Sequence, residues 1–162
     1  MIRVEQLVKQ FNSLTAVNGI SFEVAPGELF GFLGPNGAGK TTTIKILTTL
    51  LKPTSGRAAV AGYDVLKEPG KVRSIIGYVA QDVSVDDKAT GRENLMLQGH
   101  LHRMDGKLLR QRVDELLELV DLTADAKRLA ETYSGGMRKR LDLIAGLVHR
   151  PKVLFLDEPT LG

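Results

Sequence analysis

Residues 34–41 read GPNGAGKT, a glycine-rich turn that ends in a lysine and a threonine. Glycines have no Cβ, so successive backbone N–H groups of such a turn can point inward at an anion. The apolar stretch 29–33 precedes the turn as a predicted strand, and a helix is predicted from Lys40, which adds the positive end of its dipole. This strand–turn–helix order indicates an α/β fold with a phosphate-binding loop. The alternative is an ordinary glycine-rich turn with an incidental lysine.

Two adjacent carboxylates follow a second apolar segment. Val153–Leu156 has the composition of a strand buried on both faces of a parallel sheet, and Asp157 and Glu158 come directly after it. At the carboxyl edge of the sheet Asp157 is suited to hold Mg²⁺ through a water, and Glu158 to polarise the water that attacks a terminal phosphate. Two carboxylates that cap a turn before Pro159 are the alternative interpretation.

Ser134, Gly135 and Gly136 open another predicted helix. Ser134 is a suitable N-cap, and an ordinary capped helix explains the three residues by itself. The functional interpretation is that two glycines leave the N-terminus bare, able to press against a phosphate. The same chain already has a phosphate loop at 34–41, so we expect a dimer in which each copy caps the nucleotide of the other.

The hydrophobic pattern predicts the remaining elements. Alternation indicates half-buried strands in the first 24 residues. Helical periodicity indicates two amphipathic helices, one at 109–120 and one that starts at Gly135 and Gly136 and extends to Val148. Roughly Asp86 to Arg140 is interpreted as a helical subdomain inserted into an α/β core. Further strands are predicted at 58–63, at 75–80 and at 153–156.

Composition excludes several classes of protein. The net charge is +3, and the 22 basic and 19 acidic residues are interspersed, which argues against a nucleic-acid-binding tail or a polybasic membrane anchor. The absence of cysteine excludes a disulfide framework and suits a reducing cytosol. No apolar run approaches the roughly 20 residues that a membrane-spanning helix needs.

Four segments in this order resemble the ATP-binding subunit of an ABC transporter: GPNGAGKTT, Gln81 after a strand, YSGGMRKR and VLFLDEPT. More narrowly, AGYDV, GYVAQD and DDKATGRENL resemble the daunorubicin-resistance-like ATPases that energise ABC-2-type exporters. The resemblance implies a P-loop NTPase core with an N-terminal antiparallel β subdomain and an inserted helical subdomain. It implies one ABC ATPase domain over 1–162, divided into 1–85, 86–140 and 141–162.

The resemblance also implies roles for individual residues. Glu158 and Gln81 are the expected catalytic residues, and Mg²⁺ is expected at Thr41, Gln81 and Asp157. By itself Phe11 would be interpreted as a core residue, whereas the resemblance makes it the aromatic ring that stacks on adenine. Together with the Walker A loop it gives the nucleotide-binding candidates: Phe11, Gly34, Pro35, Asn36, Gly37, Ala38, Gly39, Lys40, Thr41 and Thr42. The signature motif expected to contact the partner's ATP comprises Ser134, Gly135, Gly136 and Met137. The three histidines, His100, His102 and His149, match no catalytic position.

The expected function is ATP binding and hydrolysis, with ATP and Mg²⁺ as cofactors, powering export of a drug- or antibiotic-like molecule. The expected partners are a second copy, in the ATP-bound state, and an ABC-2-type permease, with no nucleic acid. The subunit would then be cytoplasmic and peripheral on the inner face of the membrane. Two alternatives stay open: a soluble ABC ATPase in translation or DNA repair, and an inactive piece that binds but does not hydrolyse ATP. A GTPase would need an Asn-Lys-x-Asp motif, which the sequence lacks.

Three features depart from the family pattern. Tyr133 stands where leucine is usual, and Met137 where glutamine is common. Family members also continue beyond Gly162 into a D-loop, a further core strand and a switch histidine. The resemblance thus implies that the final core strands are missing from this sequence, and that these 162 residues alone are a poor ATPase of marginal stability.

Overall fold

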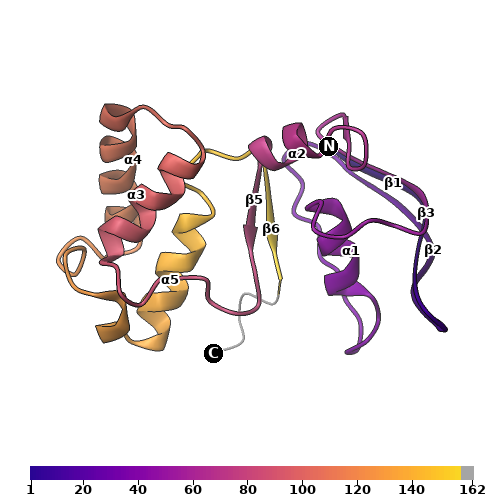
Figure 1. Cartoon of the computed structure of the whole chain (residues 1–162), viewed down its shortest axis with the longest axis horizontal. Helices are drawn as coiled ribbons and strands as arrows, with labels where there is room; N and C mark the ends of the chain where they lie inside the picture. Colours follow the sequence, from indigo (N-terminus) through magenta and orange to yellow (C-terminus); the bar gives the residue numbers. More distant parts are fainter. Residues whose placement is uncertain (158–162) are drawn as a thin grey trace. The chain divides into compact units, whose positions relative to one another are not determined.

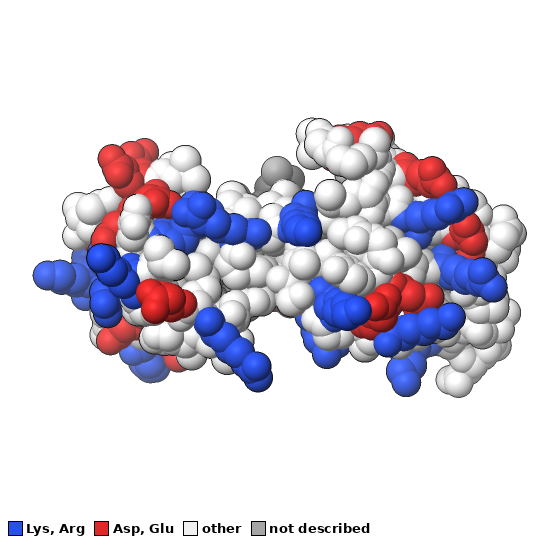
Figure 2. Space-filling view, turned by 90° about the horizontal axis from the view of Figure 1, so that it is seen from above, with Lys and Arg blue, Asp and Glu red and all other residues white. Residues whose placement is uncertain are grey.

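A computed structural model describes residues 1–157 of the chain (Figure 1). The chain divides into two compact units, Met1–Ile76 and Gly77–Gly162. Among residues 1–157, no helix is long and apolar enough to cross a membrane. Figure 2 shows Lys and Arg side chains interspersed with Asp and Glu side chains on the visible face of each unit, as the sequence order of the charges predicts.

The first unit is built on an antiparallel sheet. Its strands are β1 (Ile2–Phe11), β2 (Leu14–Val24), β3 (Ser55–Val60) and β4 (Tyr63–Asp64), in the order β2-β1-β3-β4. This confirms the expected antiparallel β region, although the strand predicted at 58–63 is two strands joined by a turn at Ala61 and Gly62.

A bulge changes the register of β1 between Val4 and Leu7. Gln6 has a positive φ of 44°, and both Val4 and Leu7 are buried in consequence. Gly56 of β3 lies against this bulge with a φ of 85°, and a Cβ there would stand 2.2 Å from the carbonyl oxygen of Gln6. Only glycine fits this position without moving the backbone.

One face of this sheet is covered by helix α1 (Lys40–Leu47), which contacts β2 and β3. Ile44, Ile46 and Leu47 of the helix are buried. A second, shorter helix, α2 (Pro69–Ile75), follows β4 and buries Val72. The sequence pattern predicts α1 but gives no signal for α2.

The predicted strand at 29–33 is wrong. Figure 1 draws no strand there, and the described residues give this segment no place in either sheet. Phe30 and Phe32 instead pack on the ring of Phe22, with centroids 5.1 and 5.2 Å away, while Leu29 and Leu33 are 99% and 97% exposed. An apolar segment becomes a buried strand only when neighbouring strands supply hydrogen bonds on its sides, and here only one row of side chains finds contacts.

The second unit contains the short pair β5 (Ile76–Val79) and β6 (Val153–Leu156), which form a sheet of their own. Figure 1 shows both strands running in the same direction. The bounds of β6 match the prediction, but its expected burial on both faces is wrong, because only Phe155 of the strand is buried and Leu156 is exposed. Among residues 1–157, β6 has one neighbouring strand, so one of its edges is uncovered by the sheet.

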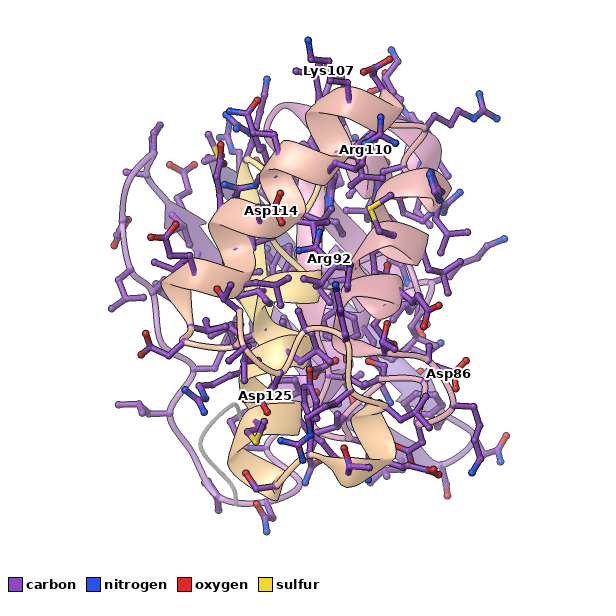
Figure 3. The ribbon with its side chains drawn as sticks, turned by 90° about the vertical axis from the view of Figure 1, so that its left-hand side faces the viewer. Asp86, Arg92, Lys107, Arg110, Asp114 and Asp125 are labelled. Carbon is purple, nitrogen blue, oxygen red and sulfur yellow. The ribbon has the colours of Figure 1, made fainter. Side chains whose placement is uncertain are left out.

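Helices make up the rest of this unit: α3 (Gly91–Leu101), α4 (Gly106–Leu119), the 3₁₀ turn η1 (Ala130–Thr132) and α5 (Gly135–Ala145). The helical period predicted for α4 is confirmed, since its apolar face is fully buried. Arg92 of α3 and Asp114 of α4 form an ion pair of 2.5 Å, and Figure 3 shows them at neighbouring positions. The unit's core contains Leu95, Leu109, Val113, Leu116, Leu117, Leu122, Leu141, Ile144 and Val148.

The predicted division into 1–85, 86–140 and 141–162 stays a prediction. The boundary between the two compact units falls at Ile76 and Gly77, and the second unit combines the helices with β5 and β6.

Two imidazole rings stack in the second unit. His102 follows α3 and His149 follows α5, with ring centroids 3.6 Å apart. Burial lowers the pKa of the His102 imidazole, and the neighbouring His149 lowers this pKa further. The folded protein therefore disfavours the protonated ring, and the unfolded chain takes up its proton first as the pH falls.

We expect the second unit to lose stability as the pH falls through the ordinary histidine pKa of about 6.5. Above that pH the contribution of His102 to the free energy of unfolding is fully present. The loss stops increasing once the pH is below the lowered pKa of His102 in the folded protein. Thermal melts followed by circular dichroism should therefore show a decline that a His102→Gln variant reduces. His100→Gln, at an exposed position of α3, is the control. Equal declines in all three proteins would contradict the prediction.

Candidate functional site

The glycine-rich loop leads directly into α1. Lys40 is the first residue of the helix, and Gly39 is its N-cap with a φ of 83°. A Cβ at Gly39 would lie 2.3 Å from the carbonyl oxygen of Ala16, so the close approach of loop and sheet depends on glycine. The loop is exposed from Gly34 to Ala38, where a ligand can reach it.

The Lys40 side chain folds back over this loop. Its Nζ donates hydrogen bonds to the carbonyl oxygens of Gly34, at 2.7 Å, and Pro35, at 2.9 Å. The ammonium group is therefore held above the loop rather than extended into solvent. Thr41 and Thr42 lie half-buried in the first turn of α1, next to the lysine. A cation, two hydroxyl groups and a helix N-terminus at one place can bind a phosphate chain.

Phe11 ends β1 at the hairpin that connects it to β2. Its side chain is 43% exposed, which excludes the interpretation of Phe11 as a core residue. The Nζ of Lys9 lies 4.8 Å from the centre of the ring. An exposed ring that already attracts a cation on its π-face can also stack on a planar base.

Asp157 directly follows β6 and is almost completely buried. Its backbone N–H donates a 2.9 Å hydrogen bond to the carbonyl oxygen of Val79, which extends the pairing of β5 and β6. Burial raises the pKa of the Tyr78 phenol, and the Asp157 carboxylate raises this pKa further. The backbone of Asp157 is thus held at the carboxyl end of the strand pair, which is the edge that the sequence predicted for this residue. Glu158, its predicted catalytic neighbour, lies outside the described residues.

Gln81 follows β5 and is exposed. Its carbonyl oxygen accepts a 3.2 Å hydrogen bond from Nζ of Lys139, a residue of α5. This hydrogen bond connects two candidate segments that are far apart in the sequence. They are the loop after β5 and helix α5, whose N-cap is Ser134.

Ser134 is the N-cap of α5, as the sequence predicts, and its Oγ accepts a 3.2 Å hydrogen bond from the backbone N–H of Met137. Gly135 and Gly136 are exposed, and a Cβ built on either would meet no atom within 4 Å. Met137 is half-buried and packs against the core of the second unit. The described residues therefore leave the first turn of α5 open to an incoming anion.

Tyr133, the unusual residue before this motif, has a structural role. The side chain is buried, and its hydroxyl donates a 2.7 Å hydrogen bond to the carbonyl oxygen of Asp125. A Cβ at Gly91 would lie 2.2 Å from that hydroxyl. The tyrosine thus connects the residue before the N-cap of α5 to the first residue of α3, and no local sequence pattern predicts these contacts.

The candidate residues divide between the two units. Phe11 and the loop with Lys40 belong to the first, whereas Gln81, Ser134 and Asp157 belong to the second. Within the second unit the structure connects Gln81 to the signature helix and Asp157 to β5.

A family profile described as ABC transporter matches residues 17–161. This chain belongs to the ABC transporter family. The match covers both units and includes the phosphate loop, Gln81, the signature helix and Asp157.

Several curated relatives carry the names of resistance proteins. The chain is 47% identical over 161 residues to "Daunorubicin resistance ATP-binding protein DrrA3" of Streptomyces coeruleorubidus, covering 99% of this chain and 51% of the relative. It is 50% identical over 149 residues to "Doxorubicin resistance ATP-binding protein DrrA" of Mycobacterium tuberculosis, covering 92% and 45%. The "Linearmycin resistance ATP-binding protein LnrL" of Bacillus subtilis is 43% identical over 162 residues. The match covers 100% of this chain and 52% of the relative. The ABC chain thus spans about half the length of these relatives.

Solved structures confirm the fold class. An ATP-binding subunit of an ABC transporter has a TM-score of 0.89 and 25% identity, covering 99% of this chain and 67% of that structure. The ATP-binding cassette MJ0796, solved as a dimer in a post-hydrolysis state with ADP and Pi, has a TM-score of 0.87 and 26% identity, covering 99% and 75%. The ABC chain therefore has the α/β P-loop NTPase fold that the motifs predicted.

Proposed function

We propose that this ABC chain forms the ATP-binding and ATP-hydrolysing part of an exporter of small, drug- or antibiotic-like molecules. The observation that carries the proposal is the 47% identity to a daunorubicin resistance ATP-binding protein across 99% of the chain. The phosphate loop, with Lys40 held over it, supports ATP binding independently of any relative.

In this proposal the loop Gly34–Thr42 binds the phosphates of ATP. Backbone N–H groups of the loop and the first turn of α1 surround the anion, and Lys40 exchanges its contacts with the loop carbonyl oxygens for phosphate oxygens. The side chain is already folded toward the loop, so binding requires little reorganisation of the lysine.

Mg²⁺ fits the proposed donor set by its chemistry. Thr41, Gln81 and Asp157 offer a hydroxyl, an amide oxygen and a carboxylate, which are the hard oxygen ligands that this ion prefers. Among residues 1–157 no group of three or more His, Cys, Asp or Glu side chains could hold a metal. A site with a single carboxylate suits an ion that arrives with the phosphates, and when bound it would neutralise their charge.

Hydrolysis is assigned to the residues at the carboxyl ends of β5 and β6. Glu158 accepts a proton from the attacking water, and Gln81 orients this water from the neighbouring strand end. The backbone hydrogen bond between Asp157 and Val79 supports the assignment, because it places the end of β6 beside the end of β5, from which Gln81 follows.

A second copy of the chain completes the site in this proposal. Ser134, Gly135, Gly136 and Met137 of one copy approach the γ-phosphate bound by the other. The exposed glycines at the start of α5 support this role, since an N-terminus free of side chains can approach an anion closely. A dimeric ABC cassette among the similar structures also supports it.

The proposed membrane partner is an ABC-2-type permease, and it places the ATPase on the cytoplasmic face of the membrane. The test is to co-express the full-length gene product with a candidate ABC-2-type permease and to prepare inside-out vesicles. We expect ATP-dependent uptake of daunorubicin or another antibiotic from a panel. ATP hydrolysis without uptake of any compound would favour a soluble, non-transport ABC ATPase instead.

We also predict that Phe11→Ala weakens ATP binding by about 1–3 kcal/mol, the usual contribution of one aromatic ring stacked on a base. The ring is exposed, so the melting temperature should change little. Titration calorimetry with ATP measures the effect, and Phe11→Tyr, which retains the aromatic face, is the control. Equal affinities for the parent and the alanine variant would contradict the role of Phe11.

A further inference from the structure

Two side chains of α5 hold the loop that follows β5. Nζ of Lys139 donates to the carbonyl oxygen of Gln81 at 3.2 Å. One turn further along the helix, Oδ1 of Asp142 accepts from both the backbone N–H and the hydroxyl of Ser84, at 3.2 and 3.1 Å. Both ends of the segment 81–84 are therefore tied to the same face of one helix. We call Lys139 and Asp142 the α5 clamp.

The burial of the Asp142 carboxylate lowers the stability of the folded protein. Asp142 is 5% exposed, between the buried core residues Leu141 and Ile144. Both hydrogen bonds reach Oδ1, whereas Oδ2 is buried and has no hydrogen-bond partner among residues 1–157. Burying a carboxylate with half its acceptors unsatisfied opposes folding, and an apolar side chain would pack here at lower cost. Stability of the core therefore does not explain the aspartate.

The Asp142 carboxylate instead connects α5 to the loop that follows β5. Ser134, at the start of α5, is the group proposed to contact the partner's ATP, and Gln81, at the start of the clamped loop, is the group proposed to orient water. A helix is rigid over the short distance from Ser134 to Asp142. Any movement of the helix N-terminus is therefore passed to the loop that carries Gln81.

We propose that Lys139 and Asp142 are positioning residues for Gln81. They connect the signature end of α5, which engages the second copy, to the loop that aligns the attacking water. The inference rests on the proposed function, because Gln81 and Ser134 have their roles only in an ATPase dimer. The clamp acts on alignment for hydrolysis and leaves the phosphate loop, in the other unit, unchanged.

The test compares variants of the full-length gene product by phosphate release and by binding of a fluorescent ATP analogue. Asp142→Leu removes the acceptor and fills the core, so we expect kcat to fall about tenfold, the order of a lost charge-assisted hydrogen bond. The affinity for the analogue should not change, and the melting temperature should stay equal or rise. Asp142→Asn retains Oδ1 as an acceptor, so its kcat should equal that of the parent.

A second set of variants separates positioning from general damage. Lys139→Met should lower kcat, whereas Lys127→Met, at an exposed lysine of the same unit, should not. In a Gln81→Ala background, Asp142→Leu should have no further effect, because both changes remove the same alignment.

The proposal is overturned if Asp142→Leu and Asp142→Asn have equal kcat, or if kcat falls only in step with the melting temperature. Additive effects of Gln81→Ala and Asp142→Leu would also overturn it. A parent protein that neither binds the analogue nor releases phosphate would overturn the proposed function itself, which is a distinguishable outcome.

Discussion

Replacing Lys40 by alanine is expected to weaken Mg-ATP binding by about 2–5 kcal/mol, the range for truncating one partner of a buried charge pair. Within residues 1–157 the Nζ of Lys40 donates its hydrogen bonds to neutral carbonyl oxygens, those of Gly34 and Pro35. Its full positive charge is therefore available to the phosphates, and no other cation lies within the loop sequence. Titration calorimetry with Mg-ATP on the full-length gene product measures the loss.

The matched control for this experiment is Lys45→Ala. Lys45 is an exposed lysine in the last turn of the same helix, so its removal changes the net charge equally but at the opposite end of α1. We expect the control to bind Mg-ATP as the parent does. If Lys40→Ala also retained the parent's affinity, the assignment of the phosphate loop would be wrong.

Glu158→Gln is expected to lower kcat by about 10²–10⁴-fold, the usual contribution of a positioned general base. The amide retains the size of the side chain but cannot take a proton from water. ATP should remain bound, because Asp157 and the phosphate loop are unchanged, and a dimer trapped with ATP should accumulate. Phosphate release and size-exclusion chromatography with ATP measure the two effects.

Glu118→Gln is the control, because Glu118 is an exposed carboxylate of α4. It should hydrolyse ATP at the parent's rate and form no trapped dimer. Persistent hydrolysis by Glu158→Gln, together with a monomer only, would exclude Glu158 as the base and the dimer as its context.

The parts of the structure that the sequence predicted are those with a strong local pattern. The apolar positions of α4 recur with the helical period and are buried as expected. Ser134 is a recognisable N-cap, and α5 begins directly after it. Val153–Leu156 is a compact apolar run, and β6 has these bounds. In each case residues near in sequence determine the local structure.

The parts that could not be predicted depend on contacts between distant residues. The segment 29–33 has the composition of a strand, but composition does not reveal whether neighbouring strands are present to pair with it. Helix α2 buries only Val72 and therefore has no periodic apolar face to recognise. The only sequence signal of the α5 clamp is Asp142, a charged residue at an inward-facing position of α5. Its hydrogen-bond partner Ser84 could not be predicted, because it is more than 50 residues away in the sequence.

The contact between Tyr133 and Gly91 restricts how this protein can vary. The tyrosine hydroxyl occupies the space that a Cβ at position 91 would need, at 2.2 Å. A leucine at 133, which is the usual residue of the family, is too short to reach that space. We therefore expect the two positions to vary together among relatives: glycine at 91 where 133 is tyrosine, and larger residues at 91 only where 133 is leucine. An alanine introduced at 91 alone should be harmful, and the Tyr133→Leu change should make it tolerable.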